Sequence, residues 1–65
     1  MIYLLVSLDY EGSKNPIGYT ESLKEMVDYL KVSRRGYFNG LEEGSNDWYV
    51  DTRGEDLRIE KVEKL

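Results

Sequence analysis

The sequence predicts a small α+β domain in the order β-β-α-α-β-β, with an antiparallel sheet packed against two helices. An alternating aliphatic run opens the chain, an amphipathic helical pattern begins at Ser22, and β-prone residues return after Gly44. The 65 residues contain no repeat, linker or low-complexity segment. We therefore expect one domain, residues 1–65.

The first predicted strand is the opening run MIYLLVSL, in which aliphatic side chains alternate with a mixed set. One face should meet the helices and the other should be only partly wet. The segment from Asp9 to Pro16 is rich in turn formers, and Ile17 to Tyr19 is typical of a short strand returning along the first. Because Met1 leads directly into this hairpin, we expect a complete small protein with neither a signal peptide nor a membrane anchor.

The first predicted helix runs from Ser22 to Leu30. Its apolar side chains have the i, i+3, i+4, i+7 spacing of one helical face: Leu23, Met26, Val27 and Leu30. Ser22 can cap it by accepting from the Glu25 N–H while the Glu25 carboxylate reaches back, as in a capping box. Thr20 is a rival N-cap two residues earlier.

A second predicted helix starts at Ser33, after a short turn at Lys31 and Val32, and stops near Gly44. We expect Val32 to be buried in the turn, and Tyr37 and Leu41 to point inward. Two helices joined this way form a helix-turn-helix, whose second helix enters the DNA major groove. Glycine is usual in such a turn, and this chain has Lys31 there. The spacing of two glycines in the second helix would allow close packing, at Gly36 and Gly40.

After Gly44, the run from Trp48 to Val50 is β-prone, and a turn from Asp51 to Asp56 follows. The tail fits two patterns. Leu57 and Ile59 alternate as in a strand, whereas a spacing of three is typical of a helix, at Ile59, Val62 and Leu65. We take it as a strand to about Val62, which makes the last two strands the wing of a winged helix-turn-helix.

Composition removes several function classes. The absence of cysteine and histidine excludes disulfides, zinc fingers and Cys/His nucleophilic pairs, and it fits a reducing cytoplasm. So short a chain does not readily enclose a substrate, so we expect no enzyme, cofactor or metal. The acidic residues of the second half lack the spacing of a calcium loop and are typical of a solvated face: Glu42, Glu43, Asp47, Asp51, Glu55 and Asp56. The net charge of −4 has the wrong sign for binding DNA by charge alone.

The order of elements, with a SLKE-like helix and an LxVSR-like turn, resembles small helix-turn-helix proteins of bacteriophages and related mobile elements. It is also similar to modular DNA-binding repeats of homing endonucleases. The resemblance implies a regulatory, winged helix-turn-helix-like protein of the bacterial host cytoplasm that binds double-stranded DNA, as a dimer or within a larger complex. By that resemblance, the second helix contacts phosphates and base edges. The DNA-binding residues it predicts are Lys31, Ser33, Arg34, Arg35, Phe38 and Asn39.

The chemistry of these residues fits that role. Lys31, Arg34 and Arg35 give a local excess of three positive charges. Arginine can bind guanine with two hydrogen bonds, and Asn39 could do the same with adenine. The competing interpretation makes the arginines solvated surface residues and Phe38 part of the core.

A second function class follows from the aromatic residues. Six tyrosines and one tryptophan cannot all fit inside so small a core, and tyrosine is enriched at protein interfaces. The alternative is therefore an acidic protein-binding module that inhibits or modulates a host or competing factor, its acidic segment imitating nucleic acid. A dimeric scaffold without a ligand is the third possibility.

Overall fold

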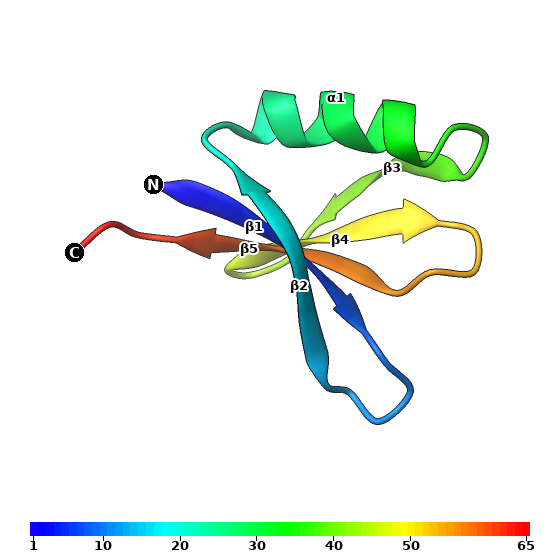
Figure 1. Ribbon diagram of the computed structural model, residues 1–65, viewed down its shortest axis with the longest axis horizontal. Helices are drawn as coiled ribbons and strands as arrows, with labels where there is room; N and C mark the ends of the chain where they lie inside the picture. The colour runs from blue at the N-terminus through cyan, green and yellow to red at the C-terminus, as the bar shows by residue number, and fades with distance from the viewer.

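The computed structural model describes residues 1–65 and contains one helix and five strands (Figure 1). The elements in chain order are β1 (Ile2–Leu8), β2 (Lys14–Thr20), α1 (Leu23–Ser33), β3 (Phe38–Glu43), β4 (Asp47–Thr52) and β5 (Leu57–Val62). The predicted order is wrong at its fourth element, because a strand stands where the second helix was expected. The domain is consequently not a winged helix-turn-helix, although the other predicted strands are present.

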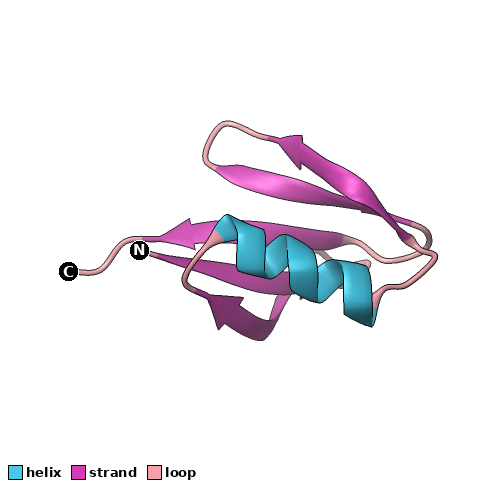
Figure 2. Ribbon diagram, turned by 90° about the horizontal axis from the view of Figure 1, so that it is seen from above, coloured by secondary structure: helices cyan, strands magenta, loops and turns pink.

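All five strands belong to one antiparallel sheet in the order β2-β1-β5-β4-β3. The first and last strands of the chain are neighbours in its middle, where Leu5 pairs with Ile59 and Ser7 with Leu57. β2 and β3 form the two edges. Since α1 connects these edges, it crosses one face of the sheet, as Figure 2 shows from above.

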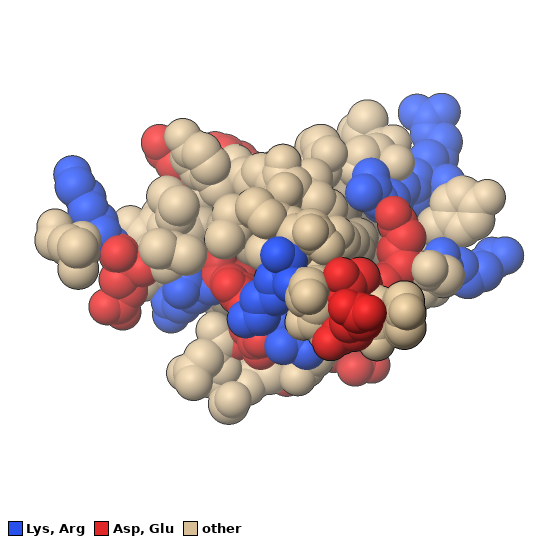
Figure 3. All heavy atoms as spheres, turned by 60° about the horizontal axis from the view of Figure 1, so that its bottom comes forward, with Lys and Arg blue, Asp and Glu red and all other residues tan.

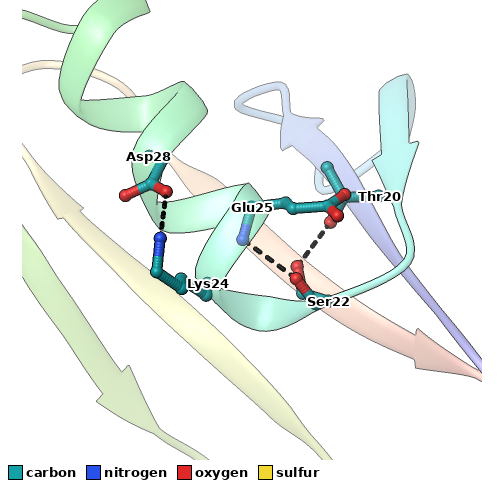
Figure 4. A network of polar contacts seen from close by, with 5 residues as sticks. All are labelled: Thr20, Ser22, Lys24, Glu25 and Asp28. Carbon is teal, nitrogen blue, oxygen red and sulfur yellow. Dashed lines mark hydrogen bonds and ion pairs between the residues drawn. The ribbon is translucent and has the colours of Figure 1, made fainter.

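The start of α1 follows the predicted capping. Ser22 is the N-cap, and its hydroxyl oxygen accepts from the Glu25 N–H at 3.1 Å (Figure 4). The return bond from the Glu25 carboxylate is not formed. Thr20, the rival cap, instead donates from its hydroxyl to the Ser22 carbonyl at 2.8 Å, which fixes the chain just before the helix.

The end of α1 differs from the prediction. The helix continues through Lys31 and Val32 and is capped by Arg34, whose N–H donates to the Leu30 carbonyl at 2.9 Å. Gly36 then adopts a φ of +83°, a conformation that costs residues with a side chain about 1–2 kcal/mol. This reversal ends the helix, and it leaves Val32 on the surface with 71% of its area exposed, so its predicted burial is wrong.

β3 occupies the rest of the predicted second helix. The register shifts between Phe38 and Gly40, which makes a bulge with Asn39 as the extra residue, and Gly40 has a φ of +152°. Gly36 and Gly40 therefore serve a turn and a bulge, and the predicted packing of helices through them is wrong. Of the side chains expected to point inward, Leu41 packs against the core but Tyr37 is 54% exposed.

The core lies between α1 and the sheet face that the helix covers. Its buried side chains come from the helix and from three central strands: Leu5, Met26, Leu30, Val50, Leu57 and Ile59. Half-buried neighbours close its margins: Tyr3, Leu23, Phe38, Leu41 and Trp48. Tyr3 and Trp48 meet with ring centroids 5.6 Å apart, a tilted aromatic pair of a kind that stabilises cores.

The opposite sheet face is closed by polar and aromatic side chains. Val6 is buried there, directly between Arg58 and Pro16 on the neighbouring strands. The Arg58 guanidinium stacks 4.7 Å from the Tyr49 ring centroid, and its Nε lies 3.5 Å from an Asp47 carboxylate oxygen. β1 thus buries Leu5 on the face that α1 covers and Val6 on the opposite face, while its other residues are half-buried and Met1 beside it is exposed.

Candidate functional site

The structure separates the residues predicted to bind DNA. Lys31 and Ser33 lie in the last turn of α1, Arg34 caps it, and Arg35 belongs to the following turn. Phe38 and Asn39 lie in β3. No second helix presents them to a DNA groove, so the predicted helix-turn-helix arrangement of this site is wrong.

Arg34 has a structural partner. Its Nε donates to a Glu55 carboxylate oxygen at 2.6 Å, which joins the end of α1 to the β4–β5 turn. The Arg34 carbonyl also accepts from the N–H groups of Tyr37 and Phe38, both at 2.9 Å. Only 21% of the Arg34 side chain is exposed, whereas Lys31 and Arg35, the other two cations predicted to bind DNA, are exposed.

Phe38 and Asn39 point to different roles. Phe38 packs against the core, which agrees with the alternative that the sequence left open for it. Asn39 is exposed at the β3 bulge, where the extra residue of a bulge has no ladder partner. The two residues therefore do not form a shared contact surface.

The remaining predicted cations, Lys31 and Arg35, lie at one end of the molecule. Arg53, which was not among the predicted contacts, lies there as well. A backbone hydrogen bond of 3.2 Å from the Arg53 N–H to the Tyr37 carbonyl brings the β4–β5 turn beside the turn after α1. The Arg53 guanidinium lies 5.9 Å from the centroid of the exposed Tyr37 ring. We call this region the basic end, formed by Lys31, Arg35, Tyr37 and Arg53.

The basic end is exposed, and none of its three cations forms an ion pair. The four ion pairs of the structure use Lys14, Lys24, Arg34 and Arg58. Basic side chains are seen gathered at the right-hand end of Figure 3, the end where α1 finishes in Figure 1. Cations near a helix C-terminus also interact favourably with the helix dipole. Part of the cluster is thus explained by helix stability.

A second candidate site is an apolar groove between β2 and α1. Leu5 and Met26 form its buried floor, and the volume is about 170 Å³. One wall is the β2 backbone from Ile17 to Tyr19 and the other is Tyr29 of α1, which is 44% exposed. The Tyr19 side chain, 66% exposed, lies on the opposite sheet face because Tyr19 pairs with Leu4 while Gly18 pairs with Leu5. We call it the β2–α1 groove, lined by Leu5, Ile17, Gly18, Tyr19, Met26 and Tyr29.

Gly18 keeps this groove open. A Cβ built on Gly18 meets no heavy atom within 4 Å, so the missing side chain leaves free space beside Leu5, its partner on β1. Sequence reasoning missed the groove because it treated Met26 as ordinary core and Gly18 as part of a short strand. The usable signal was the surplus of tyrosines, five of which are exposed: Tyr10, Tyr19, Tyr29, Tyr37 and Tyr49.

The acidic second half is partly used inside the fold. Asp47 pairs with Arg58 and Glu55 pairs with Arg34. The hollow beside the β3–β4 turn brings Glu43, Asp47 and Glu63 near Lys61, and its lining is almost entirely polar. The structure places no three Asp or Glu side chains so that they could hold a metal ion.

Two side chains with shifted pKa values, Lys24 and Asp28, lie outside both candidate sites. A hydrogen bond and the charge of Lys24 lower the pKa of Asp28, and the same contact raises the pKa of Lys24. The two groups lie at i and i+4 on α1, 2.8 Å apart (Figure 4). This pair is a surface contact of the helix.

The helix of this structure is too short and too polar to cross a membrane. Comparisons of the chain with protein-family models, with curated proteins and with solved structures find no match.

Proposed function

We propose that this domain is a protein-binding module whose partner inserts an apolar side chain into the β2–α1 groove. The observation that carries the proposal is the groove itself: its floor is buried core, and it lies between the β2 backbone from Ile17 to Tyr19 and the exposed Tyr29 of α1. Exposed apolar residues gathered around one concavity are typical of interaction sites. The net charge of −4 also favours a protein partner over a nucleic acid for this surface.

The size of the groove supports a side chain as its occupant. Pockets for small molecules usually measure about 300–1,000 Å³. The β2–α1 groove has about 170 Å³, which suits one aliphatic or aromatic side chain. Tyr29 beside such a pocket provides the kind of large, rigid contact area that is enriched at the centre of protein interfaces.

The position of β2 supports an extended partner segment. β2 is an edge of the sheet and pairs only with β1, so its other backbone edge is open beside the groove. An extended segment can add to such an edge through main-chain hydrogen bonds, with alternate side chains entering adjacent pockets. Pro16 lacks an N–H, so this pairing would use the part of β2 from Ile17 to Thr20.

The experiment selects short random-sequence peptides on the immobilised domain and measures their binding to three forms of the protein. Gly18→Val places a side chain in the groove at a position where a Cβ meets no heavy atom within 4 Å, and valine suits a strand. Asn15→Val, on the same strand but outside the groove, is the matched control. We expect selected peptides to carry an apolar residue in an extended context and to lose at least tenfold in affinity for Gly18→Val only.

Two further readouts decide the outcome. Amide NMR shifts on peptide addition should centre on Gly18, Tyr19 and Met26. Thermal unfolding of Gly18→Val must match the wild type within a few degrees, which separates blocked binding from misfolding. If peptides bind Gly18→Val as tightly as the wild type, or if selection yields no binder, the groove is not the site.

A further inference from the structure

A second site lies at the basic end and is independent of the proposed protein-binding groove. We infer that the basic end binds single-stranded nucleic acid, with Arg35, Arg53 and Lys31 on phosphates and a base stacked on Tyr37. The inference rests on two features of this end: unpaired cations and an exposed aromatic ring held beside one of them.

The charge at this end is available to a ligand. Arg34 is engaged by Glu55, but Lys31, Arg35 and Arg53 are exposed and form no ion pair. They therefore place three unpaired positive charges at one end of a chain whose overall charge is −4, beside Glu55 and Asp56 of the β4–β5 turn. Phosphate is a ligand group that such arginines bind with defined geometry, because the guanidinium can donate two parallel hydrogen bonds to it, as it can to a carboxylate.

Tyr37 distinguishes a nucleic acid from other anions. Its ring is 54% exposed, and its backbone is fixed by bonds to Arg34 and Arg53, at 2.9 and 3.2 Å. An aromatic ring next to guanidinium groups is the platform on which unpaired bases stack. An acidic peptide would use the arginines but would gain little from the ring.

The shape of this end favours single strands over a duplex. It consists of the last turn of α1, the turn that follows it and the turn between β4 and β5, and no separate helix projects from it (Figure 1). Reading base edges in a major groove requires an inserted helix or β-ribbon. A single strand can instead present both its phosphates and its bases to a small exposed surface with cations and an aromatic ring.

The test measures fluorescence anisotropy of labelled oligodeoxythymidine with the full chain, in salt from about 50 to 200 mM. Three phosphate contacts on a single strand predict a slope near −2 in log affinity against log salt, which is roughly a 20-fold loss over that range. Duplex DNA of equal length and polyglutamate serve as competitors. We expect both to compete at least tenfold less well than unlabelled oligodeoxythymidine.

Variants separate the two contributions. The double variant Arg35→Ala/Arg53→Ala should lose at least tenfold in affinity and flatten the salt slope. Lys61→Ala/Lys64→Ala changes the net charge by the same amount near the C-terminus, away from the basic end, and should retain most of the affinity. Tyr37→Leu should weaken binding about tenfold. Tyr37→Phe should bind like the wild type, because only the ring is needed for stacking.

Each contrary result overturns the inference. Equal losses of affinity in the two double variants would show that binding depends on the net charge of the chain and not on the basic end. Equal competition by polyglutamate, or no effect of Tyr37→Leu, would make the site one for anions without bases. No binding at about 50 mM salt would remove the site altogether. Unchanged Trp48 fluorescence and thermal unfolding confirm that each variant is folded.

Discussion

Arg34 and Glu55 form an ion pair that joins the C-terminal end of α1 to the β4–β5 turn, with 2.6 Å between the Arg34 Nε and a Glu55 carboxylate oxygen. The pair connects segments 21 residues apart in sequence, so we expect it to stabilise the fold rather than to read DNA. Arg34→Gln and Glu55→Gln should each lower the free energy of unfolding by up to about 1 kcal/mol, less at high salt.

A double-mutant cycle in urea measures the coupling within this pair. The coupling energy of Arg34 and Glu55 should exceed that of Lys24 and Asp28, whose side chains are more exposed. Zero coupling between Arg34 and Glu55 at low salt would show that the ion pair is not formed in solution and that Arg34 is available for a ligand.

The contrast between Leu30 and Val32 tests the corrected helix. Leu30 is fully buried in the core, whereas Val32 is 71% exposed on the last turn of α1. Leu30→Ala should cost about 2–5 kcal/mol, and Val32→Ala should stay within about 0.5 kcal/mol of the wild type.

Urea unfolding followed by Trp48 fluorescence is the measurement for these two variants. Because a domain of this size has only about 3–10 kcal/mol of stability, Leu30→Ala can unfold outright. Leu30→Val is the milder companion that keeps the comparison measurable. A large cost for Val32→Ala would argue that Val32 is buried, as the helix-turn-helix prediction required.

Glycine substitutions distinguish the turn after α1 from the groove. Gly36 has a φ of +83°, so Gly36→Ala should destabilise the domain by about 1–2 kcal/mol. Gly18 has no such constraint and no neighbour near its Cβ position, so Gly18→Ala should be neutral or stabilise by up to about 1 kcal/mol. In thermal unfolding, Gly36→Ala should have the lowest melting temperature, and Gly18→Ala should melt at or above the temperature of the wild type. A stabilised Gly36→Ala would contradict the turn geometry.

The sequence predicted the parts of this fold that depend on local patterns. The Ser22 cap, the apolar stripe through Leu30 and the first strand are all set within a few residues, and they are confirmed. The side chain of β1 that enters the core under α1 is Leu5, from the mixed set and not from the aliphatic one. The tail strand ending at Val62 is confirmed as well. Each of these follows from one period or one capping contact.

The failure lies between Val32 and Gly44, where local signals conflict. Ser33 fits a helix cap, but Gly36 and Gly40 each oppose a helix by about 1 kcal/mol, and Phe38 is as suited to a strand. The edge of β4 decides between them, since it supplies backbone partners from Trp48 to Thr52 for a strand there. That pairing is non-local, so residue spacing alone does not reveal it.

The candidate sites were predicted only in part for the same reason. Arg35 and Lys31 were chosen for their charge, and the structure keeps them exposed at one end. Arg53 joins them through a hydrogen bond to Tyr37, which depends on the position of the β4–β5 turn. Likewise, the β2–α1 groove exists only because the helix crosses the sheet beside an edge strand that contains Gly18.

Ser22 should contribute to stability through its hydroxyl. Ser22→Ala removes the acceptor for the Glu25 N–H and should lower the free energy of unfolding by about 1 kcal/mol. Ser22→Asp keeps an acceptor at the N-cap and should remain close to the wild type. Helical circular dichroism and urea unfolding report both effects, and equal losses in the two variants would show that the cap contributes through something other than an acceptor.

The Lys24–Asp28 pair should make a small pH-dependent contribution to stability. The hydrogen bond and the charge of Lys24 lower the pKa of Asp28 from 3.8, with a further effect from Lys31, so this stabilisation is present above that value and is lost as the pH falls through the lowered pKa. The same contact with Asp28 raises the pKa of Lys24 from 10.5, so its share is full below that value and is lost as the pH rises through the raised pKa.

The measurement is an NMR titration of the Asp28 carboxyl carbon in the wild type and in Lys24→Met. We expect the pKa of Asp28 to be lower in the wild type and to move back toward 3.8 in the variant, because the main donor and the nearest charge are gone. Identical Asp28 titrations would show that the 2.8 Å contact is not populated in solution.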